Sequence, residues 1–135
     1  MFNIIEACVA GPFISFLCLD PIAGAAGSHD DTTLRLDFST HWADYDKKIM
    51  FFDALGDPVA VISLTDEMRC GENCDCYDIT VPAAAKAVDG DIRFTVKGVQ
   101  TEDGAVVSTV YSAPGMLRVL PVLWSPEAEE SGVGN

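Results

Sequence analysis

The sequence predicts an all-β domain, an antiparallel β-sandwich with one short helix. The chain has 135 residues, of which 49% are apolar and 21% charged, which is typical of one globular domain with its own core. Short runs of β-branched and aromatic residues alternate with turn signals along its central part. The sequence offers no amphipathic helix of about ten residues to connect parallel strands, so a βαβ arrangement is disfavoured.

Period-two alternation is the clearest strand signal. Because successive side chains of a strand point to opposite faces, each alternating run should bury one set of apolar residues. The residues expected on the buried face are Leu34, Leu36 and Phe38 in one run and Ile92, Phe94 and Val96 in another. The strands are expected, in chain order, at residues 34–38, 48–52, 59–64, 77–81, 91–98, 105–111 and 116–123.

Glycine and proline mark the connections between these runs. The triplet 56–58 (Gly-Asp-Pro) predicts a tight turn, so the strands on either side of it should form a hairpin. Pro82 should end the strand before it, because proline lacks the N–H that a sheet needs. Residues 83–87 (AAAKA) have the best helical propensity in the chain and are followed by Asp89-Gly90, which predicts one short helical turn.

Three regions differ in composition. Residues 1–27 are apolar and form either an N-terminal arm or the first strands of the domain. Residues 28–124 form the predicted sandwich, and residues 125–135 form an acidic tail that we expect to be flexible. The run from Ala7 to Leu19 is shorter than the about 20 residues that cross a bilayer, so no membrane span is expected. A signal peptide there is disfavoured by Glu6 and by the lack of preceding basic residues.

The charge balance limits the partners. Twenty-one acidic and eight basic residues give a formal net charge of −13. Nucleic acids and anionic membranes are therefore not expected as partners, because both require clustered Lys and Arg. The five cysteines, an odd number without a clear secretory context, favour reduced thiols over a disulfide framework.

The densest group of chemically reactive residues is the loop around Cys70, Cys74 and Cys76. Three thiols within this short segment are weak candidates for a metal site, because a structural zinc site normally uses two separated ligand pairs. A polar loop with free or locally oxidised cysteines is the favoured interpretation, and a functional disulfide is a further alternative. No cofactor is expected.

Catalytic residues are not evident. The carboxylate pairs 30–31, 44 with 46, and 66–67 all lie beside turn signals, where Asp commonly caps the backbone. The chain has no Gly-x-Ser-x-Gly motif, and neither His29 nor His41 stands in a recognisable catalytic setting. We therefore expect a protein that is not an enzyme. Trp42, Tyr45 and Trp124 are expected in the core, although exposed rings there would suit carbohydrate binding.

The order of these elements has a counterpart in a known group. Residues 36–51 (LDFSTHWADYDKKIMF) resemble a signature of small bacteriophage and prophage virion proteins, in which a strand ends at a Trp corner. In that signature a Tyr or Leu and then a Lys lead into the next strand, as Tyr45 and Lys47 do here. Residues 76–82 resemble the family's Cys-x-Val/Ile-Pro strand end. The similarity covers about residues 33–124.

The resemblance implies an immunoglobulin-like β-sandwich that serves as a structural or accessory piece of a virion, on the tail, the baseplate or the head. Its partners would be other virion proteins and copies of itself, and it implies no catalysis. Trp42, Tyr45, Pro82 and Trp124 would then be framework residues. A carbohydrate- or host-surface-binding module, with Trp42 or Trp124 as a stacking platform, is the alternative.

The N-terminal apolar segment suggests where contacts form. It is too apolar for a freely solvated arm, and excess apolar surface is normally buried against something. It either belongs to the first strands of the domain or adds an edge strand or interface to a neighbouring subunit. The residues expected at such an interface are Phe2, Ile4, Ile5, Phe13, Phe16 and Leu17.

Overall fold

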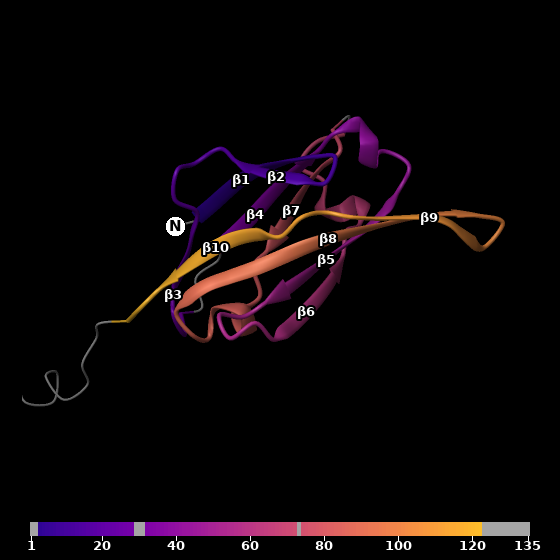
Figure 1. The fold of residues 1–135 in the computed structure, drawn as a ribbon. Coiled ribbons are helices and arrows are strands. Elements are labelled where there is room, and N and C mark those ends of the chain that lie inside the picture. The colour runs from indigo at the N-terminus through magenta and orange to yellow at the C-terminus, as the bar shows by residue number, and fades with distance from the viewer. Residues whose placement is uncertain (1–2, 29–31, 73, 123–135) are drawn as a thin grey trace, which may run out of the picture.

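Two β-sheets pack face to face around a single core in the computed structural model, which describes residues 3–28, 32–72 and 74–122 (Figure 1). The prediction of an all-β fold is confirmed. One sheet, sheet A, has the order β2-β1-β4-β7, and the other, sheet B, has the order β3-β10-β8-β5-β6 with β9 paired to β8. The strands of sheet A are β1 (Asn3–Ala10), β2 (Phe13–Phe16), β4 (Thr32–Phe38) and β7 (Cys76–Thr80). Those of sheet B are β3 (Ile22–Ala25), β5 (Asp46–Phe52), β6 (Pro58–Ser63), β8 (Gly90–Glu102), β9 (Ala105–Tyr111) and β10 (Gly115–Leu120).

Strand direction differs from the expectation of wholly antiparallel sheets. β1 pairs with β4 in parallel, and β3 pairs with β10 in parallel, whereas the other pairs are antiparallel. Between β1 and β4 the chain forms β2 and then crosses to sheet B as β3, so it re-enters sheet A running in the direction of β1. Periodicity in the sequence shows which face a residue takes but not the direction of its strand.

The residues that the structure describes contain three short 3₁₀ turns, where one short helix was expected. The predicted turn at residues 83–87 is found as η3 (Ala83–Lys86), and η1 (Thr40–Trp42) and η2 (Asp66–Met68) are additional. Turns of three or four residues carry no hydrophobic periodicity, so the sequence pattern did not reveal the other two.

The alternating runs form the core as expected. Leu34, Leu36 and Phe38 are buried on β4, and Ile92, Phe94 and Val96 are buried on β8. The predicted hairpin around residues 56–58 is β5–β6, with Met50 opposite Val61. The buried side chains of β4 in sheet A and of β8 in sheet B belong to one core between the two sheets, as in other β-sandwiches.

The N-terminal segment supplies strands to both sheets. β1 lies between β2 and β4, and its alternate residues Ile5, Ala7 and Val9 are buried in the core. β3 lies at the edge of sheet B, where the buried hydroxyl of Thr32 donates a hydrogen bond of 2.6 Å to the carbonyl of Ala23. The acidic tail at 125–135 lies outside the described residues.

One end of the core is closed by the indole of Trp42, whose residue is 2% exposed. Its ring centroid lies 5.5 Å from that of Phe38 and 6.4 Å from that of Tyr45, and its Nε1 donates a 2.8 Å hydrogen bond to the carbonyl of Gly11. On β8 the backbone of Gly98 passes directly against the ring: a Cβ there would lie 2.9 Å from Trp42 Cζ3. The Trp corner of the sequence therefore connects both sheets and the β1–β2 turn.

A buried lysine lies beside this indole. Lys47 is buried and its Nζ lies 3.1 Å from a carboxylate oxygen of Asp75 and donates a 3.1 Å hydrogen bond to the carbonyl of Tyr45. The same ammonium lies 5.3 Å from the ring centroid of Phe38 and 5.7 Å from that of Tyr77, within the range of cation–π attraction. Burial raises the pKa of the Tyr77 phenol, and the nearby Asp75 carboxylate raises it further.

We expect Gly98→Ala to lower the free energy of unfolding by about 1 to 3 kcal/mol, because the added methyl overpacks the contact with Trp42 and Val110. Gly71→Ala is the matched control, since its Cβ would lie at an ordinary 3.7 Å from the sulfur of Cys74. Urea unfolding of both variants checks this. Equal stability of the two would show that the Gly98 contact is loose.

We expect Lys47→Met to lower the free energy of unfolding by about 2 kcal/mol, because it leaves the Asp75 carboxylate without its nearest cation in a largely desolvated site. Adding Asp75→Asn removes the uncompensated charge, so the double variant should be more stable than Lys47→Met alone. Urea unfolding of the two single variants and the double variant measures the coupling. If the double variant loses the sum of the unfolding free energies lost by the two single variants, the coupling between Lys47 and Asp75 is contradicted.

Candidate assembly surface

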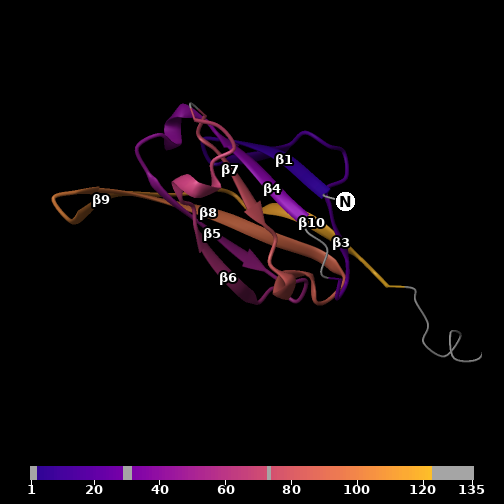
Figure 2. The ribbon, with the colours of Figure 1, turned by 180° about the vertical axis from the view of Figure 1, so that it is seen from behind.

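A two-stranded arm projects from the sandwich. β5 pairs with β8 only as far as Val99, and beyond that point residues 100–108, here called the arm, pair only with one another. Figures 1 and 2 show the β8–β9 hairpin extending well past the other strands. Asp103 and Gly104 both have positive φ, of 51° and 81°, as a tight hairpin turn requires.

The arm has no core of its own. Val106 and Val107 are 62% and 52% exposed, and residues 101–107 are all exposed. An isolated two-stranded hairpin is only marginally stable in water, since it buries too little apolar surface to offset the entropy of ordering it. The arm therefore offers apolar side chains and unpaired strand edges to a partner.

An apolar pocket lies at the base of the arm. It has a volume of about 420 Å³ and is lined by Gly11, Pro12, His41, Trp42, Tyr45, Val110 and Tyr111. The hydroxyl groups of Tyr45 and Ser108 lie 2.9 Å apart in a hydrogen bond, which joins the base of the arm to the Trp corner. The pocket wall is thus built from the same residues that close the core.

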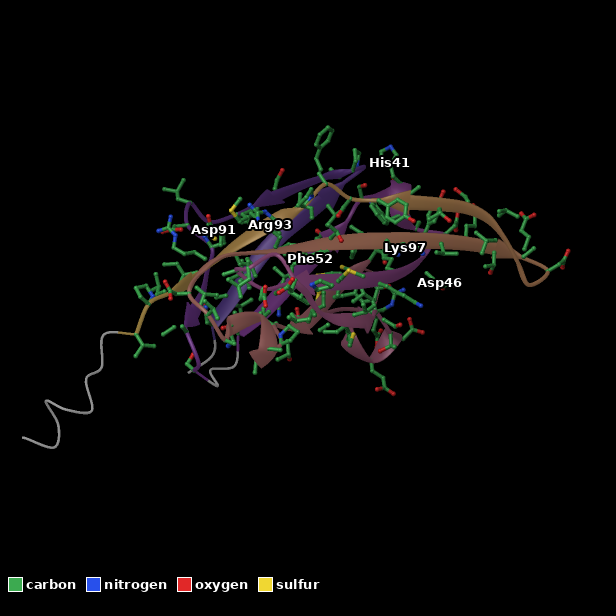
Figure 3. All side chains as sticks on the ribbon, turned by 60° about the horizontal axis from the view of Figure 1, so that its bottom comes forward. His41, Asp46, Phe52, Asp91, Arg93 and Lys97 are labelled. Atoms are coloured by element: carbon green, nitrogen blue, oxygen red, sulfur yellow. A yellow bond between two sulfur atoms is a disulfide. The ribbon has the colours of Figure 1, made fainter. Side chains whose placement is uncertain are left out.

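The outer face of sheet B carries basic residues next to this pocket (Figure 3). Lys48 on β5 lies directly opposite Lys97 on β8, and Lys97 lies opposite Tyr111, with its Nζ 5.9 Å from the tyrosine ring centroid. Like charges directly opposite each other in a sheet are unfavourable. Within the part of the chain that the structure describes, neither lysine forms an ion pair with a carboxylate.

The residues expected at an N-terminal interface differ in their exposure to solvent. Ile5 is a core residue, 3% exposed, so its place at an interface was wrong: it lies on the inward face of β1. Phe16 is half-buried, with its ring edge-on to Phe94 at 6.2 Å between centroids. Ile4, Phe13 and Leu17 are exposed, with Phe13 on the edge strand β2, and Phe2 lies outside the described residues.

The proposed framework positions differ in depth. Trp42 is buried and Tyr45 and Pro82 are half-buried, whereas Trp124 lies outside the described residues. A carbohydrate platform needs an exposed ring face, and the indole of Trp42 does not offer one. The exposed aromatic ring at the pocket is that of Tyr111.

The cysteine loop is cross-linked. Cys70 and Cys76 form a disulfide, with Cα atoms 5.6 Å apart, whereas Cys8, Cys18 and Cys74 are free. Reduced thiols, which the odd cysteine count favoured, do not hold for Cys70 and Cys76, whereas the locally oxidised loop that the sequence left open does. The bridge Arg69–Tyr77 brings the two backbones together across this short loop. Two of the three candidate metal ligands are consumed by this bond. Across residues 3–28, 32–72 and 74–122, no three His, Cys, Asp or Glu side chains gather as metal ligands.

The carboxylates of the turn regions act locally. Asp66 accepts a 3.0 Å hydrogen bond from Nε of Arg69, which raises the pKa of the guanidinium. On sheet A, Asp78 accepts two hydrogen bonds from Arg35, of 2.7 and 2.9 Å, and these bonds raise the pKa of the Arg35 guanidinium. These charged hydrogen bonds connect β4 to β7 and Arg69 to the turn that contains Asp66.

Sequence reasoning missed the arm. The expected strands at residues 91–98 and 105–111 are present, but the sequence did not show that they extend beyond the neighbouring strands. The signal available was the length of the β8 run compared with β5, since alternating buried residues end at Gly98 while strand-forming residues continue.

Comparison with known proteins gives a likeness of fold. No protein-family model and no curated protein matches the sequence. Among solved structures, the chain is similar to the N-terminal domain of phage TP901-1 ORF48, with a TM-score of 0.56 and 9% sequence identity, over 88% of this chain and 98% of that chain. In the described part of the chain, no helix has the length and apolar character needed to cross a bilayer.

The burial of Trp42 has a spectroscopic consequence. In a Trp124→Phe variant, Trp42 is the remaining tryptophan, and we expect blue-shifted emission with little quenching by iodide, because the indole is shielded from water. Steady-state fluorescence with added oligosaccharides is the measurement. Red-shifted emission that responds to glycans would contradict this packing.

Proposed function

We propose that this chain is a structural or accessory component of a phage virion, and that it works through protein–protein contacts and not through catalysis. The observation that carries the proposal is the likeness of fold to a phage domain, which extends over 98% of that domain. The proposal includes an immunoglobulin-like type of sandwich and a place on the tail, the baseplate or the head.

The surface supports a role in assembly. The arm presents apolar side chains outside the core, and the pocket at its base is lined by aromatic and apolar groups. Exposed apolar side chains of this kind favour contacts with another protein. Exposed Phe13 and Leu17 along the β2 edge offer a second contact region, toward other virion proteins.

The charge supports protein partners over nucleic acid or membrane. The formal net charge of −13 repels phosphate at long range. A chain made in the bacterial cytoplasm and built into a particle would meet its partners there by complementary patches.

We expect the chain to be found in phage particles at a constant ratio to the other structural proteins. Particles from a host that produces the phage encoding this chain would be purified on a density gradient and analysed by quantitative mass spectrometry, with an abundant host protein as the contamination control. Deleting the gene should yield particles that lack a substructure in electron micrographs, restored by a plasmid copy. A chain abundant in the lysate but absent from particles would refute the proposal.

A further inference from the structure

The arm carries negative charge at its tip and has positive charge at its base. Its tip bears Glu102 and Asp103, both exposed, and among the described residues neither forms an ion pair. Its base is flanked by the lysine pair Lys48 and Lys97. One acidic residue, Asp46, lies opposite Val99 one row nearer to the arm than Lys97 (Figure 3), so these two rows of β5 and β8 hold two lysines and one carboxylate.

The apolar features follow the same arrangement. Val106 and Val107 lie near the tip, and the pocket lined by Trp42, Tyr45 and Tyr111 lies at the base. Tyr111 belongs to both base features, since it lines the pocket and lies opposite Lys97. The arm is acidic and apolar at its tip and basic at its base, where the exposed Tyr111 lies on the same face as Lys97, so the element is complementary to itself in antiparallel orientation.

We propose that two copies of this chain pair through their arms, antiparallel about a two-fold axis. The acidic tip of each arm meets Lys48 and Lys97 of the other copy, and its valines pack against Tyr111, which lies on the same face as Lys97. The proposal rests on the assembly function above and names a second copy as the partner of this surface.

Three features of the arm favour a second copy of this chain over an unrelated protein as its partner. The two-fold arrangement makes every contact twice from one hairpin sequence, as isologous interfaces do. It places carboxylates beside the otherwise unfavourable pair of facing lysines. It can also cover one of the two strand edges of each arm beyond Val99, where β8 and β9 each have a partner on one side only.

The first test is the association of the purified full-length protein. Sedimentation equilibrium over micromolar to millimolar concentration, at an ionic strength that screens the repulsion between two chains of net charge −13, should show a monomer–dimer equilibrium. Val107→Asp should raise the dissociation constant about tenfold or more, because it removes buried apolar area and adds a charge to the contact. Leu55→Asp is the matched control: Leu55 is 73% exposed on the β5–β6 turn, away from the arm, so this variant should dimerise like the parent.

The second test is a charge exchange between tip and base. Lys97→Glu and Glu102→Lys should each raise the dissociation constant about fivefold, since the contact occurs twice in a two-fold dimer. The double variant restores the opposite-charge contact and should dimerise like the parent. Unfolding curves would show that all variants are folded, and nonreducing gels would exclude disulfides through the exposed Cys18 or Cys74.

Several outcomes would overturn the pairing: a monomer at all concentrations, equal weakening by Leu55→Asp and Val107→Asp, or a double charge variant at least as weak as the singles. These results are separable from the particle experiment. A monomeric protein that is nevertheless present in particles would refute the arm pairing and leave the virion role intact. A protein that dimerises in solution but is absent from particles would refute the virion role and leave the arm pairing intact.

Discussion

The packing of Trp42 at the open end of the sandwich is the contact on which the rest of the molecule depends. A sandwich needs its ends closed as well as its faces, since water entering there would reach the apolar side chains of both sheets. The indole fills this end against Phe38 on sheet A and Gly98 on sheet B, and its N–H reaches the carbonyl of Gly11 in the β1–β2 turn. One side chain thus sets the distance between the sheets where the arm leaves the domain.

The same closure positions the proposed assembly surface. The long strand β8 belongs to the core up to Gly98 and continues beyond it into the arm. The pocket wall at the arm's base includes Trp42 and Tyr45, so a surface for partners is built directly on the best-packed part of the domain. A rigid base limits the entropy lost when a marginal hairpin becomes ordered against a partner, which favours binding.

Electrostatics separates this surface from the rest of the molecule. The chain has a large excess of carboxylates, yet two of its eight basic residues face each other beside the arm. The other basic side chains include Lys47, Arg35 and Arg69, which are committed to Asp75, Asp78 and Asp66 within the domain. Among the described residues these two lysines form no ion pair, and their uncompensated charge supports the proposed contact between arms.

The sequence by itself determined the all-β class, the hairpin at residues 56–58 and the buried faces of β4 and β8, because period two and turn chemistry are local properties of the chain. It also singled out the Trp corner. Only the tertiary structure decided that β1 runs parallel to β4, that Ile5 faces the core, that Cys70 bonds Cys76 and that β8 and β9 extend beyond their neighbours. Each of these depends on which segments become neighbours in space, and pairing between distant strands leaves no periodic trace in either strand alone.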